Sequence, residues 1–126
     1  MLGQENLVAM LGTSDPARAR KFFEDTLGLT FVADYPHALI FQTANARLQV
    51  AKDPAASAPH GTALGWSVAD LRGVMRGLIA RGVTFERFDG MDQDELGVWS
   101  PGGPKTGVAW FKDPDGNLLS LSSADG

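Results

Sequence analysis

The chain has no cysteine among its 126 residues. This absence excludes disulfides, thiolate metal sites and cysteine nucleophiles, and it is typical of proteins from a reducing compartment. We therefore expect a cytoplasmic protein. Histidine is scarce as well: the two residues are His37, which follows a turn proline, and His60, which lies in a Pro-, Ala- and Gly-rich stretch. We expect both imidazoles to be solvated or bound within turns, rather than to ligate a metal.

Two further features are missing, a basic surface stripe and a long apolar run. The formal net charge is −4 and the lysines and arginines are scattered, which argues against a nucleic-acid partner. No apolar run approaches the ~18–20 residues of a membrane span, and residues 1–6 lack the charged and apolar regions of a signal peptide. We expect neither membrane insertion nor secretion.

The first half of the chain predicts a strand, a helix and three more strands. Residues 6–13 are a short apolar run, which favours a buried strand. Asp15 and Pro16 then form a helix start, because aspartate caps N–H groups and proline suits the first helical position. Gly28 predicts the end of that helix. The strands that follow are expected at residues 29–33, 38–42 and 47–51.

The second half repeats this order. A strand is expected at residues 62–68, then a helix that begins at the cap Asp70 and ends at Gly82, then a strand at 83–87. Residues 88–105 form a long acidic, Gly-rich segment, which we interpret as a lid or part of an interface. A hairpin closes the pattern, with strands near 106–111 and 117–122 around the turn at 114–116.

These halves form an internal repeat. The helix caps Asp15 and Asp70 are 55 positions apart, and Gly28 and Gly82 are 54 apart. We predict an α+β fold made of two βαβββ modules that form a curved, cup-like mixed sheet with helices outside. The whole chain, 1–126, is then one domain, with module one at about 5–52, a linker at 53–61 and module two at about 62–123.

The repeat and three motifs resemble the vicinal-oxygen-chelate superfamily, which includes glyoxalases, bleomycin-resistance proteins and extradiol dioxygenases. The resemblance spans about residues 6–122, and its most specific parts are residues 13–29, 65–71 and 110–117. Metal-dependent members hold a divalent metal with side chains from four inward strands. Matching by motif places those four positions at Val8, Gln49, Ala63 and Ser120.

This ligand set departs from the one that the family uses. Val8 and Ala63 have no donor atom, and Ser120 offers a neutral hydroxyl where a carboxylate is expected. We therefore expect no cofactor and no metal, and leave catalytic residues unassigned. A carboxylate site within residues 89–95 is an alternative, although its spacing does not match a calcium loop.

The remaining inward positions predict a pocket for a small molecule, planar or cationic. Its expected lining is Val8, Met10, Arg47, Gln49, Ala63, Ser67, Trp99, Trp110 and Ser120. The resemblance also implies a homodimer. The favoured function is metal-free binding rather than catalysis. The alternatives are a lyase or dioxygenase with a displaced metal site, and an accessory domain without a dedicated ligand.

Overall fold

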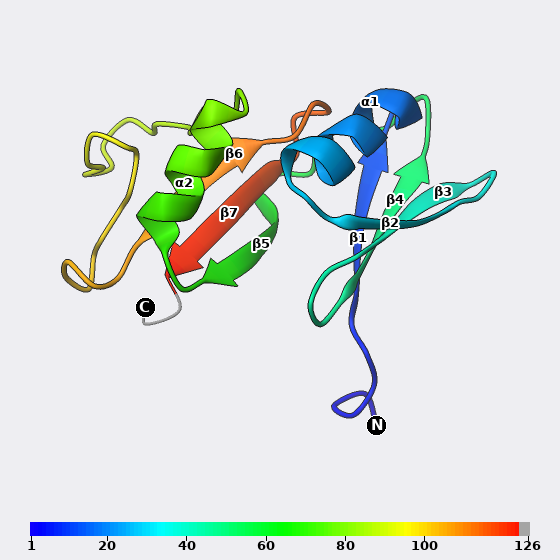
Figure 1. Cartoon of the computed structure of the whole chain (residues 1–126), viewed down its shortest axis with the longest axis horizontal. Helices are drawn as coiled ribbons and strands as arrows, with labels where there is room; N and C mark the ends of the chain where they lie inside the picture. The colour runs from blue at the N-terminus through cyan, green and yellow to red at the C-terminus, as the bar shows by residue number, and fades with distance from the viewer. Residues whose placement is uncertain (124–126) are drawn as a thin grey trace. The chain divides into compact units, whose positions relative to one another are not determined.

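The computed structural model describes residues 1–123 and divides the chain into two compact units (Figure 1). The first unit comprises residues 1–58 and 114–116. The second comprises residues 59–113 and the described residues from 117 onward. Within residues 1–123, each unit contains one mixed sheet and one helical segment, so the α+β class is confirmed, with seven strands in two sheets.

The first unit has a four-stranded sheet in the order β1-β4-β3-β2. Its strands are β1 (Val8–Thr13), β2 (Thr30–Asp34), β3 (Ala38–Gln42) and β4 (Arg47–Lys52). β1 runs parallel to β4, and the other two pairings are antiparallel. These are the strands that the sequence predicts, with ends that differ by at most two residues.

The helical segment of the first unit changes type part-way along. α1 (Pro16–Arg20) begins at Asp15, whose carboxylate accepts the Arg18 N–H at 3.2 Å. It continues as the π-helical stretch η1 (Lys21–Thr26), where the Leu27 N–H donates to the Phe22 carbonyl at 2.9 Å. The predicted helix is therefore present between Asp15 and Gly28, but its second part is π-helical.

The repeat explains this π stretch. From cap to closing glycine, the first helical segment is one residue longer than the second, because the repeat offset falls from 55 to 54. A π turn takes in an extra residue without interrupting the helix. Within this stretch Phe23 is fully buried and packs on Phe41 of β3, with ring centroids 5.6 Å apart.

The second unit has a three-stranded sheet in the order β5-β7-β6. The strands are β5 (Thr62–Val68), β6 (Val108–Lys112) and β7 (Leu118–Ser123), and the helix is α2 (Leu71–Ala80). Asp70 caps α2 by accepting the Gly73 N–H at 3.1 Å, as predicted. Leu71, Met75 and Leu78 form the buried face of the helix.

The predicted strand at 83–87 is not formed. Only one bridge, between Phe85 and Phe111, joins this segment to β6, with a single further hydrogen bond from the Glu86 N–H to the Trp110 carbonyl at 2.7 Å. The Gln93 side chain takes the next backbone groups: it donates to the Glu86 carbonyl at 3.1 Å and accepts the Phe88 N–H at 2.9 Å. Backbone groups that bond to a side chain cannot extend a strand ladder.

The turn between β6 and β7 is divided between the two units: its ends bond within the second unit and its tip bonds within the first. Asp113 and Asn117 are buried in the second unit, and the Asn117 side chain donates to the Asp113 carboxylate at 2.8 Å. Residues 114–116 belong to the first unit. There one oxygen of Asp115 accepts the Ser14 N–H at 2.9 Å and the Ser14 hydroxyl at 3.0 Å, and it lies 3.4 Å from Arg18 Nη2. Gly116, with φ of 85°, supplies the left-handed turn position.

Within residues 1–123, no helix combines the length and apolar character that membrane crossing requires.

Candidate functional site

Each sheet has one face covered by its helical segment and one opposite face, which we name the open face. In the first unit the register places Val8 beside Arg47 and Met10 beside Gln49. The alternate positions Leu11, Leu48 and Val50 are buried on the helix side. Four of the predicted lining residues, Val8, Met10, Arg47 and Gln49, therefore share the open face of the first unit.

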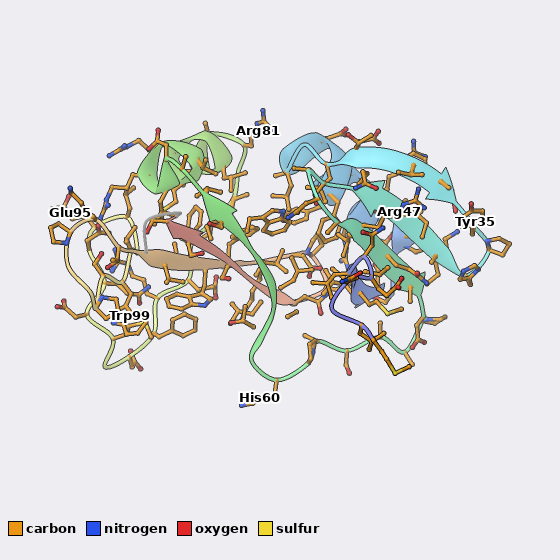
Figure 2. The ribbon with its side chains drawn as sticks, turned by 90° about the horizontal axis from the view of Figure 1, so that it is seen from below. Tyr35, Arg47, His60, Arg81, Glu95 and Trp99 are labelled. Atoms are coloured by element: carbon orange, nitrogen blue, oxygen red, sulfur yellow. The ribbon has the colours of Figure 1, made fainter. Side chains whose placement is uncertain are left out.

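This open face is apolar on the edge strand β1 and polar on the neighbouring strands β4 and β3. Val8 is 51% exposed and Met10 is 64% exposed. On β4, Arg47 Nε donates to the Gln42 side chain of β3 at 3.3 Å, and the Gln42 amide donates to the Thr43 and Ala46 carbonyls at 2.9 Å each. Gln42 therefore holds the guanidinium of Arg47, which projects from β4 in Figure 2.

In the second unit, Ser120 occupies the middle of the open face. It pairs with Gly65 of β5 on one side and Trp110 of β6 on the other. Ser67 pairs with Ser122 two positions along, and Ala63 falls at a register shift between Thr62 and Leu64. The predicted residues Ala63, Ser67, Trp110 and Ser120 thus come from one sheet.

Ser120 also depends on the glycine beside it. A Cβ atom at position 65 would lie 2.1 Å from the Ser120 hydroxyl oxygen and 2.9 Å from the Ser120 carbonyl oxygen. Both distances are far below van der Waals contact, so only glycine fits there without movement. Ser120 and Gly65 therefore pack directly against each other on the open face.

Three aromatic side chains stand together next to Ser120. The ring centroids of Trp99 and Trp110 are 6.1 Å apart, and those of Phe88 and Trp110 are 5.5 Å apart with the planes at 88°. We name these three residues the aromatic cluster. Its members are partly exposed, so they present ring surface to a ligand. Trp66 is different: it pairs with Leu121 and stacks on Phe111, on the helix side of the same sheet.

Backbone bonds hold Trp99 in place. Its N–H donates to the Val108 carbonyl and its carbonyl accepts the Val108 N–H, both at 2.9 Å. Directly bridged residues point to the same side of a sheet, and Val108 pairs with Ser122 of the open face. In Figure 2, Trp99 lies on the opposite side of the β6 and β7 ribbons from α2.

Asp94 organises the loop that leads to Trp99. One of its oxygens accepts the N–H groups of Leu96, Gly97 and Val98 at 2.9–3.1 Å, and the other accepts from Arg72 at 2.7 Å. Burial opposes ionisation, but these donors outweigh it and hold the pKa of Asp94 below its ordinary value. This carboxylate is therefore committed to the loop. Among residues 1–123, no three His, Cys, Asp or Glu side chains gather where they could hold a metal.

Two contributors to this site were missed from sequence. Phe88 lies in the acidic segment, for which the sequence predicts no aromatic contact. Its position directly after an apolar run is the feature that could have indicated one. Gln93 carried no signal, because its hydrogen bonds to Glu86, Phe88 and Gly97 depend on the folded loop.

The sequence profile of the Glyoxalase/Bleomycin resistance protein/Dioxygenase superfamily matches residues 7–121. The chain belongs to this superfamily. The resemblance found in its motifs is thus confirmed. In a comparison with curated proteins, none matches the chain.

Several solved structures share the fold. A member from Sphaerobacter thermophilus DSM 20745 is 24% identical, with a TM-score of 0.72 and coverage of 98% of this chain and 99% of that one. TnmS3, an antibiotic binding protein from Streptomyces sp. CB03234, is 22% identical, with a TM-score of 0.72 and coverage of 98% of both chains. Lactoylglutathione lyase from Agrobacterium tumefaciens is 16% identical, with a TM-score of 0.69 and coverage of 97% and 95%.

The metal that the family resemblance implies does not fit the residues found here. Val8 and Ala63 offer no donor, and Ser120 offers a neutral hydroxyl packed over Gly65. The Gln49 amide alone cannot replace a set of imidazoles and carboxylates. The four family positions therefore supply no plausible site for a divalent cation, on the chemistry of their side chains.

Proposed function

We propose that this superfamily member binds a small planar molecule without a metal, and that the aromatic cluster of the second unit holds it. The supporting observation is the grouping of Trp99, Trp110 and Phe88 beside the small residues of the open face. Aromatic rings offer a large contact area to a flat ligand, and stacking contributes about 0.5–1.5 kcal/mol per pair beyond area burial.

The neighbouring side chains suit the rim of such a ligand. Ser120 is a small residue directly beside Trp110, and the hydroxyls of Ser67 and Ser120 can donate or accept hydrogen bonds. The chain carries a formal charge of −4, which favours a cationic ligand through its long-range field. Binding of an antibiotic by the structurally similar TnmS3 is consistent with this role.

A thermal-shift and calorimetry experiment tests the proposal. The probes are proflavine, a planar cation, anthraquinone-2-sulfonate, a planar anion, and tetramethylammonium, a non-planar cation. We expect proflavine to bind most tightly and Trp99→Ala to weaken it about fivefold to tenfold, the equivalent of one lost stacking contact. Trp66→Phe is the matched control, because Trp66 lies on the helix side of the sheet.

Elemental analysis of the purified protein accompanies these measurements. Stoichiometric metal that survives dialysis would overturn the metal-free proposal in favour of a lyase or dioxygenase with a displaced metal site. Absence of any shift across the planar probes, or equal affinity in Trp99→Ala and wild type, would instead favour an accessory domain without a dedicated ligand.

A further inference from the structure

A cavity lies in the second unit, and none of the residues of the aromatic cluster lines it. It has a volume of about 640 Å³ and lies between α2 and the loop after residue 86. Its lining consists of Arg72, Arg76, Arg87, Gln93, Asp94, Glu95 and Leu96. Small-molecule sites have volumes of roughly 300–1,000 Å³, so the cavity is of a suitable size for a metabolite.

The three arginines of this cavity differ in how their charge is balanced. Arg72 is paired with the Asp94 carboxylate at 2.7 Å. Arg87 instead donates to two neutral acceptors, the carbonyls of Asp94 and Glu95, at 2.6 and 2.7 Å. The carbonyls fix the position of this guanidinium without cancelling its charge.

Arg76 supplies a second uncompensated charge. It lies one helical turn after Arg72 on α2 and is exposed. No ion pair or hydrogen bond of its side chain occurs within residues 1–123. Two guanidinium groups without a carboxylate partner therefore contribute to one cavity, and their planar forks match the geometry of carboxylate and phosphate oxygens.

The wall that carries Arg87 and Glu95 is built before any ligand arrives. Gln93 donates to the Glu86 and Gly97 carbonyls at 3.1 and 2.8 Å, and thereby joins the two ends of the loop. Asp94 accepts three backbone N–H groups of the following residues. A wall fixed in this way loses little conformational entropy when a ligand binds. Figure 2 shows Glu95 on the α2 side of the loop and Trp99 on the other side of the sheet.

We propose that this cavity binds a small molecule through an oxyanion, a phosphate or a carboxylate group, held by Arg76 and Arg87. Glu95 carries the opposing charge: its carboxylate lines the same cavity, so it weakens the attraction and selects against weak monoanions. The site differs from the aromatic cluster in its residues and in the sign of charge that it prefers.

Titrations followed by NMR of ¹⁵N-labelled protein test this site, with sodium phosphate and trisodium citrate as the probes at constant ionic strength. We expect saturable shifts of amides in residues 72–76 and 87–96. If phosphate saturates the shifts at the lower concentration, the site prefers a phosphate group. If citrate does, the site prefers a carboxylate. Arg76→Gln should weaken binding about fivefold to tenfold, because a charge-assisted hydrogen bond is lost. Glu95→Gln should tighten it.

Lys105→Gln is the control, since it removes one positive charge from the same unit outside the cavity. Equal affinities for wild type, Arg76→Gln and Glu95→Gln would overturn the proposal, as would the absence of saturation with both anions. The outcome is separate from that of the planar-ligand proposal: Trp99→Ala should leave phosphate or citrate binding unchanged, and Arg76→Gln should leave proflavine binding unchanged. Unchanged circular dichroism of each variant verifies that the fold is retained.

Discussion

The two units of the chain start from the same plan and differ in one connection. In the first unit, residues 35–37 join β2 to β3, and the four-stranded ladder is complete. In the second unit, residues 88–107 separate the segment after α2 from β6, and the corresponding strand is reduced to one bridge. The long connection replaces strand pairing with bonds made by Gln93, Asp94 and Arg87.

The difference shows how a repeated fold acquires sites in one copy only. The same long connection supplies Phe88 and Trp99 to the open face and Glu95 to the cavity beside α2, and Arg87 directly precedes the connection. Loops carry function more readily than ladders, because their side chains are not committed to sheet packing. Both proposed sites accordingly lie in the second unit.

We expect the largest effect on stability from Asp115, which lies in the hairpin between β6 and β7 but belongs to the first unit. Asp115→Ala removes an acceptor whose side chain is 4% exposed and leaves the Ser14 donors without it. We expect a loss of about 3 kcal/mol in the free energy of unfolding, measured by urea denaturation. Asp92→Ala, at an exposed loop position, is the control. Equal urea midpoints for both variants would contradict this role for Asp115.

A smaller effect should come from the position where the two open faces differ most. The first unit pairs Met10 with Gln49, and the second pairs Gly65 with Ser120 at the matching place. Gly65→Ala forces a Cβ atom against the serine, and we expect it to cost about 2 kcal/mol of stability. Gly77→Ala, in open space on α2, should instead stabilise by about 0.5–1 kcal/mol. Stabilisation by both changes would show that Ser120 moves freely.

We expect the smallest effect in the dependence of stability on acidic pH. In both units, burial would raise the pKa of one carboxyl, but hydrogen bonds and an arginine lower it: Asp115 in the first and Asp94 in the second. A lowered folded-state pKa contributes stability above the unfolded value of about 3.9, and this contribution is lost as the pH falls through the folded-state value. We therefore expect stability to decline below about pH 4, and Asp115→Asn to flatten that decline more than Asp94→Asn. Identical pH profiles for wild type and both variants would argue against this assignment.

Much of the fold followed from local signals. Asp15 and Asp70 cap helices because their carboxylates reach an N–H three residues on, and that geometry is readable in sequence. Strands β3 and β5 have the predicted bounds because turn residues or capping residues flank them. The strand predicted at 83–87 failed for a non-local reason, since Gln93 takes the backbone groups that a ladder would need.

The candidate sites were less accessible from sequence. Strand alternation was enough to group Val8, Met10, Arg47 and Gln49 on one face. The packing of Ser120 on Gly65 and the cavity lined by Arg76 and Arg87 depend on pairings between distant residues. Short sequence motifs cannot predict such pairings, because they depend on the register of the strands and on the closure of the loop.

The short turn at 114–116 gives the first unit a segment from the second half of the sequence. Its flanking strands are part of the second unit, whereas the three residues themselves belong to the first. A fragment that ends at residue 58 would lack the carboxylate that binds Ser14 and Arg18, and the complementary fragment would present that carboxylate without its partners. A gene split at the linker would therefore divide the residues of the first unit between two fragments, so neither fragment would carry that unit complete.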